Sequence, residues 1–193
     1  MLQDHNQKIW VGTSNGLDII EYEENMPKIK RFSQQKKSLS LSHPSIWCLL
    51  EDDKNQLWVG TEKGLNLISR RRDKVRYFFH DPADKKSISQ DLIRCMLQDQ
   101  KRQLWIGTED GLNRYSSRTQ KFDRFLNTAS GNKEIIHCLY EHTEGTIWVG
   151  TPAGLNKVIQ NGNRVTFEAF NVKNGFADNT IHAIQEDLSL IHI

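Results

Sequence analysis

The sequence lacks any long apolar run, since no hydrophobic stretch approaches the roughly 18 residues of a membrane-spanning helix. It also lacks a strong charge of one sign, because 26 Lys and Arg residues stand against 24 Asp and Glu residues, for a net charge of +2. That balance gives no electrostatic reason to expect nucleic acid as a partner. No segment has sustained helical periodicity, which argues against a helical protein.

Cysteine is scarce, and its placement is informative. The three cysteines, Cys48, Cys95 and Cys138, recur at one position of a repeated segment, where Ala183 stands in a fourth copy. A small, slightly apolar residue suits a crowded inner strand. Because the number is odd and the sites fall in separate repeats, we expect no disulfides.

What the sequence does contain is a repeated motif. It reads KIWVGTSNGLD, QLWVGTEKGLN, QLWIGTEDGLN and TIWVGTPAGLN, with its tryptophans at Trp10, Trp58, Trp105 and Trp148. The intervals between these tryptophans are 48, 47 and 43 residues. Around each motif lie short segments of five to eight residues, rich in β-branched and aromatic types and separated by turn residues. These are strand and hairpin signals, and four strands at this period are typical of one β-propeller blade.

We therefore predict an all-β fold of four-stranded antiparallel blades within residues 1–187. The first strand of each blade should be innermost and the fourth outermost. The chain should form an open arc of a larger propeller. The expected blades are residues 1–33, 45–80, 92–126 and 135–172, and the inner strand of a further blade should occupy 180–187.

The motif itself is explained better by packing than by chemistry. Trp58 and Leu65 should fill the space between blades, and Gly60 should let a neighbouring backbone approach. Gly64 should end a tight turn at positive φ, with Thr61 and Asn66 bonding turn backbone groups. The two residues inside the turn vary freely and no Walker lysine follows, so a phosphate-binding loop is excluded.

With these residues in view, the repeat I-x-x-L-x-E-D-x-x-x-x-L-W-V-G-T-x-x-G-L-N resembles the two-component regulator propeller repeat, over nearly the whole chain. The resemblance implies the periplasmic sensor region of a hybrid histidine kinase, as in gut Bacteroidetes, which detects oligosaccharides. It further implies partners elsewhere in the parent protein: the remaining blades, a membrane helix, a kinase core and a homodimeric arrangement. It also implies that the complete propeller has about seven blades, and it implies no cofactor.

Both ends of the sequence lead to expectations of their own. The letters MLQD at Met1 match MLQD at Met96, inside an inner strand, so Met1 is interpreted as an internal methionine. Six residues beyond Asp187 a tryptophan should stand, but the chain reads LSLIHI. A common transposon-end sequencing adapter encodes those letters, so residues 188–193 are expected to be a non-native tail.

Candidate ligand residues are sought where the repeats differ near the channel mouth. The second residue of the inner strand meets that condition, being Trp47, Arg94, His137 and His182 in successive repeats. An aromatic ring beside Arg and His could bind a sugar, particularly an anionic one. The alternative is that these side chains only line a wet channel.

Two other function classes stay open. Glu141 and Glu186 lie four residues beyond His137 and His182, so a His/Glu site of the kind found in propeller lyases is conceivable. No metal-ligand spacing supports it, and neither a catalytic residue nor a metal is predicted. A protein–protein scaffold is the other alternative.

Overall fold

The structure is a computed structural model that describes residues 1–32, 39–125, 134–162 and 164–186. It contains four separate four-stranded sheets, each antiparallel and each in simple sequence order. The first holds β1 (Leu2–Gln3), β2 (Ile9–Thr13), β3 (Gly16–Glu23) and β4 (Met26–Arg31). The second holds β5 (Ile46–Glu51), β6 (Leu57–Thr61), β7 (Gly64–Ile68) and β8 (Val75–Phe78). The third holds β9 (Ile93–Gln98), β10 (Leu104–Thr108), β11 (Gly111–Ser116) and β12 (Lys121–Phe125), and the fourth holds β13 (Cys138–Glu141), β14 (Ile147–Thr151), β15 (Gly154–Asn161) and β16 (Arg164–Phe170).

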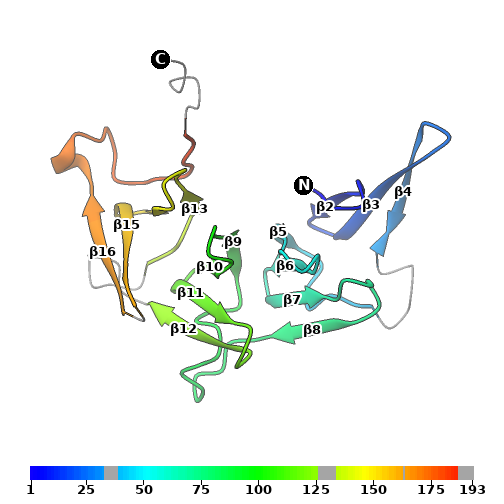
Figure 1. Ribbon diagram of the computed structural model, residues 1–193, viewed down its shortest axis with the longest axis horizontal. Helices are drawn as coiled ribbons and strands as arrows, with labels where there is room; N and C mark the ends of the chain where they lie inside the picture. Colours follow the sequence, from blue (N-terminus) through cyan, green and yellow to red (C-terminus); the bar gives the residue numbers. More distant parts are fainter. Residues whose placement is uncertain (33–38, 126–133, 163, 187–193) are drawn as a thin grey trace.

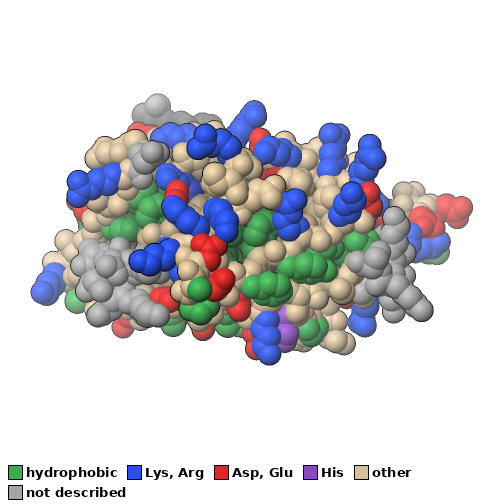
Figure 2. Space-filling model, turned by 90° about the horizontal axis from the view of Figure 1, so that it is seen from below, with side chains coloured by type: hydrophobic (Ala, Val, Ile, Leu, Met, Phe, Trp, Pro, Cys, Tyr) green, Lys and Arg blue, Asp and Glu red, His purple; other side chains and the backbone are tan. Residues whose placement is uncertain are grey.

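The four sheets stand side by side along an open arc (Figure 1). Strands β5, β9 and β13 lie on its concave side, and β8 and β12 lie on its convex side. The predicted all-β propeller architecture, with the first strand of each sheet innermost, is confirmed. Viewed from below, the outer wall carries many Lys and Arg side chains among fewer acidic and apolar ones (Figure 2).

Hydrophobic cores fill the spaces between neighbouring sheets. Trp58 and Leu65 of the second sheet pack with Ile93, Leu104 and residues around them in the third. Equivalent clusters join the first sheet to the second around Trp10 and the third to the fourth around Trp105. Each of these three tryptophans is at most 2% exposed. These motif tryptophans therefore pack in the cores between sheets, as the sequence predicted.

The glycine of each Trp-Val/Ile-Gly-Thr segment leaves space for an isoleucine side chain of the inner segment that follows next along the arc. A Cβ on Gly60 would lie 2.7 Å from Ile93 Cγ2 and on Gly107 2.6 Å from Ile136 Cγ2. Gly12 and Gly150 receive Ile46 and Ile181 in the same way. The expectation that Gly60 admits a neighbouring backbone is therefore wrong, because the neighbour is an isoleucine side chain.

The same glycines also make room for the cysteines of their own sheet. A Cβ on Gly60 would lie 2.4 Å from Cys48 Sγ, and on Gly107 2.5 Å from Cys95 Sγ. The three cysteines are free thiols. Burial raises the pKa of Cys48 to about 12, so this thiol stays protonated and unreactive at neutral pH.

The turn between the second and third strands has the expected chemistry, with one correction. Gly64 has a φ of +106°, and Thr61 Oγ1 donates to the carbonyl of Gly64 at 2.7 Å. Asn66, however, serves the connector that precedes its sheet: its Oδ1 accepts from the amide of Ser42 at 2.8 Å. Asn113 does the same for Ser89 at 2.9 Å. These two asparagines thus tie the connectors before the second and third sheets to those sheets.

Beyond β16 the chain forms a short 3-10 helix, η1 (Val172–Asn174), which the periodicity analysis did not predict because three residues are too few to show a period. Residues 180–186 are not in a strand, although the amide of Ile181 donates to Thr151 O at 3.0 Å. They lie against the fourth sheet where an inner strand would begin, and no later strand within the described chain pairs with them. The tail expected to be non-native, 188–193, lies outside the described residues. None of the described helices is long and apolar enough to cross a membrane.

Candidate functional site

The four candidate residues form two neighbouring pairs. The guanidinium carbon of Arg94 lies 5.3 Å from the centre of the Trp47 ring. The rings of His137 and His182 stack with centroids 5.1 Å apart and planes 5° from parallel. Arg94 is also close enough to His137 for its charge to affect that imidazole. The four residues therefore form a continuous row from one inner segment to the next, called here the inner-strand row.

Irregularities in the inner strands explain how this row arises. In the second sheet Ile46 pairs with Thr61 and Cys48 with Gly60, so Trp47 is left over as an unpaired residue. Arg94 is left over in the third sheet in the same way, between Ile93 and Cys95. An extra residue of this kind is a β-bulge, which redirects a side chain away from the regular alternation of the strand. Bulges thus place Trp47 and Arg94 in the inner-strand row.

Arg94 has a partner that the sequence analysis missed. Its Nη2 donates to Glu109 Oε1 at 2.6 Å, whereas its Nε is shielded from solvent and has no hydrogen-bond partner among the described residues. Glu109 lies in the turn between β10 and β11, at a position that varies between repeats and was interpreted as free of constraint. The pair offsets the positive charge, which makes the site less selective for anions than the Arg alone suggested. The residue type at this turn position differs between repeats, and that difference was the sequence signal that could have identified Glu109.

The two histidines differ in their surroundings. His182 is exposed, whereas His137 is half-buried and its Nδ1 donates to the carbonyl of Ile181 at 3.2 Å. Burial lowers the pKa of His137, and the nearby charges of His182 and Arg94 lower it further, against the raising effect of that hydrogen bond. His137 is therefore neutral near pH 7. A stacked neutral imidazole offers both a flat face and a free nitrogen to a ligand.

The structure does not assemble the His/Glu site considered as an alternative. Four residues of extended chain separate each histidine from its glutamate by about 13 Å. Glu141 instead accepts from the backbone amide of Gln100 at 3.0 Å, and Glu186 accepts from Tyr140 and contacts His142 Nε2 at 3.0 Å. Glu141 thus joins the fourth sheet to the third, and Glu186 joins the segment 180–186 to the fourth sheet.

One cluster in the described residues has the composition of a metal site. Ligand atoms of Asp4, His5 and Glu51 lie within 4.8 Å of one another. Arg72 already occupies this cluster, with its Nη2 2.7 Å from Glu51 Oε1 and 3.5 Å from Asp4 Oδ2. Asp4 Oδ2 also accepts from the Trp10 indole at 2.9 Å. A cation would have to displace the guanidinium, so the cluster is better explained as an ion pair between the first two sheets.

Comparison with known proteins agrees with the repeat. The chain contains two-component regulator propeller repeats, matched at residues 40–63, 87–110 and 130–153, which confirms the resemblance. Each match covers a connector, an inner strand and a Trp-containing strand. No curated protein sequence matches the chain.

Solved structures share the fold. The extracellular domain of the hybrid two-component system BT4673 from B. thetaiotaomicron is similar over 94% of this chain, with a TM-score of 0.72 and 23% identity. The extracellular domain of BT3049 from the same organism is similar over 96% of this chain, with a TM-score of 0.58 and 15% identity, and the similarity covers 36% of the BT3049 structure. Virginiamycin B lyase from Staphylococcus aureus is similar over 90% of this chain, with a TM-score of 0.61 and 10% identity, and the similarity covers 55% of the lyase structure.

The chain spans about a quarter of BT4673, since the similarity covers 23% of that structure. At these identities the comparison establishes the fold. The chain is thus a propeller segment that resembles the extracellular sensor domains of hybrid two-component systems.

Proposed function

We propose that this chain is a ligand-sensing segment of the periplasmic part of a hybrid histidine kinase, and that it recognises an oligosaccharide. Its partners would be the remaining blades and the membrane, kinase and output parts of a homodimeric parent protein. The propeller repeats and the fold they share with two-component sensor domains support this function. A purely enzymatic role is less well supported, because the histidines and glutamates of the lyase alternative lie apart.

The observation that carries the proposal is the inner-strand row. Trp47 is 49% exposed, so its ring can stack on the apolar face of a sugar. The Arg94 side chain is 25% exposed, and its Nη groups carry more N–H donors than the one that bonds to Glu109. Glu109 can in turn accept from sugar hydroxyls. A ligand lying along the row would thus meet an aromatic face, a donor and an acceptor in succession.

The test is calorimetric titration of the complete sensor domain with oligosaccharides released from candidate polysaccharides. A charged hydrogen bond contributes about 1.5–3 kcal/mol, so Arg94→Ala should weaken binding roughly 10- to 150-fold. His137→Ala should weaken it as well, and both variants should keep the parent thermal stability. Trp58→Ala, chosen as the contrasting core variant, should cost about 3–5 kcal/mol of stability.

Clear binding by the parent with unchanged affinity in Arg94→Ala and His137→Ala would contradict the proposed site. The ligand would then bind at the long connectors or on another part of the parent protein.

A further inference from the structure

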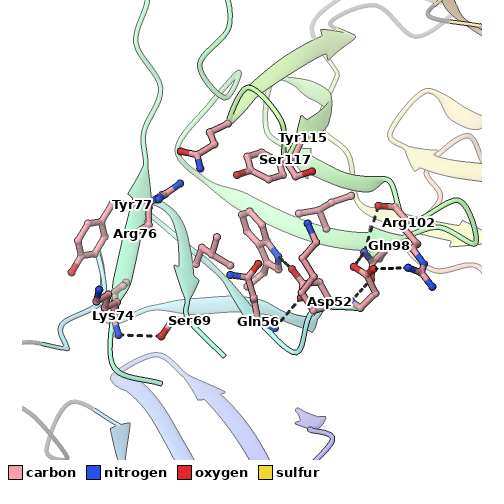
Figure 3. Close-up of a pocket in the computed structure, with 17 residues that line it drawn as sticks. Asp52, Gln56, Ser69, Lys74, Arg76, Tyr77, Gln98, Arg102, Tyr115 and Ser117 are labelled. Atoms are coloured by element: carbon pink, nitrogen blue, oxygen red, sulfur yellow. Dashed lines mark hydrogen bonds and ion pairs between the residues drawn. The ribbon is translucent and has the colours of Figure 1, made fainter. Parts of the chain in front are cut away.

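A groove of about 920 Å³ lies between the second and third sheets, away from the inner-strand row (Figure 3). Its size is within the range of small-molecule sites. Its walls come from the turns after β5 and β9, the turns after β7 and β11, and strand β8. It shares no residue with the row, so it is a separate feature of the molecule.

The corresponding junctions on either side are covered by arginine. Between the first and second sheets, the Arg72 guanidinium lies 5.3 Å from the Trp10 ring centre and bonds to Glu51. At the third sheet, Arg114 lies 5.7 Å from the Trp105 ring centre. No arginine lies over Trp58 among the described ring contacts, because Leu67 is the residue that pairs across from it. The junction at Trp58 therefore has an open groove at the place where an arginine covers the tryptophan in the other two junctions.

The floor of the groove is aromatic and aliphatic. Trp58 and Leu104 form its buried base, and the Tyr115 ring lies 4.9 Å from the Trp58 ring centre, partly exposed beside them. Burial raises the pKa of Tyr115 and the nearby charge of Arg76 opposes the rise, so Arg76 lies close to the phenol. Tyr115 therefore offers a ring face next to a cation.

The rim of the groove is cationic and hydrogen-bonding. Lys74 and Arg76 lie at one end and Arg102 at the other (Figure 3). Lys74 and Arg76 make no ion pair with an acidic residue among the described contacts, whereas Arg102 pairs with Asp53 at 3.4 Å. The other acid of the groove, Asp52, is already bonded to the Trp58 indole at 2.9 Å. The end at Lys74 and Arg76 thus presents two cationic side chains that make no ion pair, within the described part of the chain, with Asp52 or Asp53, the two acids of the groove.

We propose that this groove is a second ligand site, which binds ring-shaped organic anions. A carboxylate or sulfate group of the ligand bonds to Lys74 and Arg76, and a ring face lies against Tyr115. Gln56, Gln98 and Gln120 line the remainder and can donate to or accept from ring substituents. Sugar acids and aromatic acids share this chemistry.

Titration calorimetry of the complete sensor domain tests the site with two anions, trigalacturonate and 1-naphthoate. Each has a neutral partner of nearly the same size, the methyl-esterified trigalacturonate and 1-naphthamide. At least one anion should bind saturably, more tightly than its neutral partner, and more weakly as salt is raised. Which anion binds better identifies the source of the ring.

The test variant is Lys74→Gln/Arg76→Gln, both of whose side chains are exposed and therefore dispensable for folding. Arg70→Gln/Arg71→Gln is the charge-matched control, since both arginines lie in the same turn and are exposed but do not line the groove. The Lys74→Gln/Arg76→Gln variant should lower affinity roughly 2- to 30-fold relative to the parent, and the control should not.

The proposal is overturned if neither anion binds, if the neutral partners bind equally well, or if Arg70→Gln/Arg71→Gln weakens binding as much as Lys74→Gln/Arg76→Gln. Because Arg94→Ala leaves this groove intact, its result bears on the inner-strand row alone.

Discussion

At the scale of single residues, the six-residue interval between Asp and Trp has a structural explanation. Asp52 Oδ2 accepts from the Trp58 indole at 2.9 Å, while Oδ1 accepts from the amides of Lys54 and Gln56 in the intervening turn. Asp99 and Trp105 repeat the contact at 2.9 Å. One carboxylate thus closes a turn and holds the indole that packs between sheets.

The first prediction concerns this contact. Asp52→Ala should destabilise the protein by about 2–3 kcal/mol, because it leaves a buried indole donor and two turn amides without an acceptor. The adjacent, more exposed Asp53 is the matched control, and Asp53→Ala should cost less than about 1 kcal/mol. Urea unfolding followed by tryptophan fluorescence measures both. Equal losses in the two variants would show that the contact contributes nothing particular.

The second prediction concerns pH. Because the pKa of His137 in the folded state lies below its ordinary value of 6.5, the unfolded chain binds more protons as pH falls. Stability should therefore be retained above pH 6.5 and be lost as pH falls through the folded pKa. In His137→Gln the loss of unfolding free energy between pH 7.5 and pH 5 should be smaller than in the parent. Parallel pH profiles for the two proteins would contradict this.

At the scale of elements, an isoleucine in or near each inner strand packs on a glycine of the preceding sheet and holds the neighbouring segments in register. The contact recurs at all four motif glycines, Gly12, Gly60, Gly107 and Gly150. It fixes how far each inner strand is displaced along its neighbour. The bulges that carry Trp47 and Arg94 immediately follow these isoleucines, so the register also positions the inner-strand row.

The third prediction tests this contact between isoleucine and glycine. Gly107 does not have a positive φ, so alanine there adds only a steric conflict, with Cys95 Sγ at 2.5 Å and Ile136 Cγ2 at 2.6 Å. Gly107→Ala should cost about 1–3 kcal/mol of stability. Adding Cys95→Ala removes one of the two conflicts and should restore part of the loss. An unchanged urea midpoint in Gly107→Ala would show that the sheets shift without cost.

At the scale of the whole molecule, the two outer faces of the arc lack a neighbouring sheet. Leu57 and Ile68 are fully buried because the first sheet covers them, whereas Ile29, on the corresponding face of the first sheet, is 71% exposed. Trp148 is likewise less buried than the other three motif tryptophans. The arc therefore presents apolar surface at both ends.

The fourth prediction is that the 193-residue chain self-associates through these faces. If roughly 400 Å² of apolar surface is uncovered per face, about 10 kcal/mol of burial is missing per face, a value comparable to the whole stability of a domain. Sedimentation velocity should show association that increases at micromolar concentrations. Ile29→Lys should raise the monomer fraction, and Lys28→Gln is a control on the same strand. A monomeric, cooperatively melting chain would contradict the prediction.

The sequence by itself determined the sheets, their order and the role of the motif tryptophans. These properties follow from local signals: strand periodicity, turn residues such as Gly64, and a repeat that places the same residue in the same environment each time. The inner-strand row was found in part, because Trp47, Arg94, His137 and His182 share one repeat position. That they form a ligand site remains a prediction.

Only the tertiary structure decided what depends on how strands and sheets align. The pairing of Arg94 with Glu109, the bulges beneath the row, and the contacts of Glu141 and Glu186 with other segments follow from that alignment. The groove at Trp58 is open because Leu67 stands where the third sheet has Arg114, and because no arginine of the next turn reaches over the indole as Arg72 does. Such contacts depend on side-chain reach between sheets, which the spacing of letters along a chain does not specify.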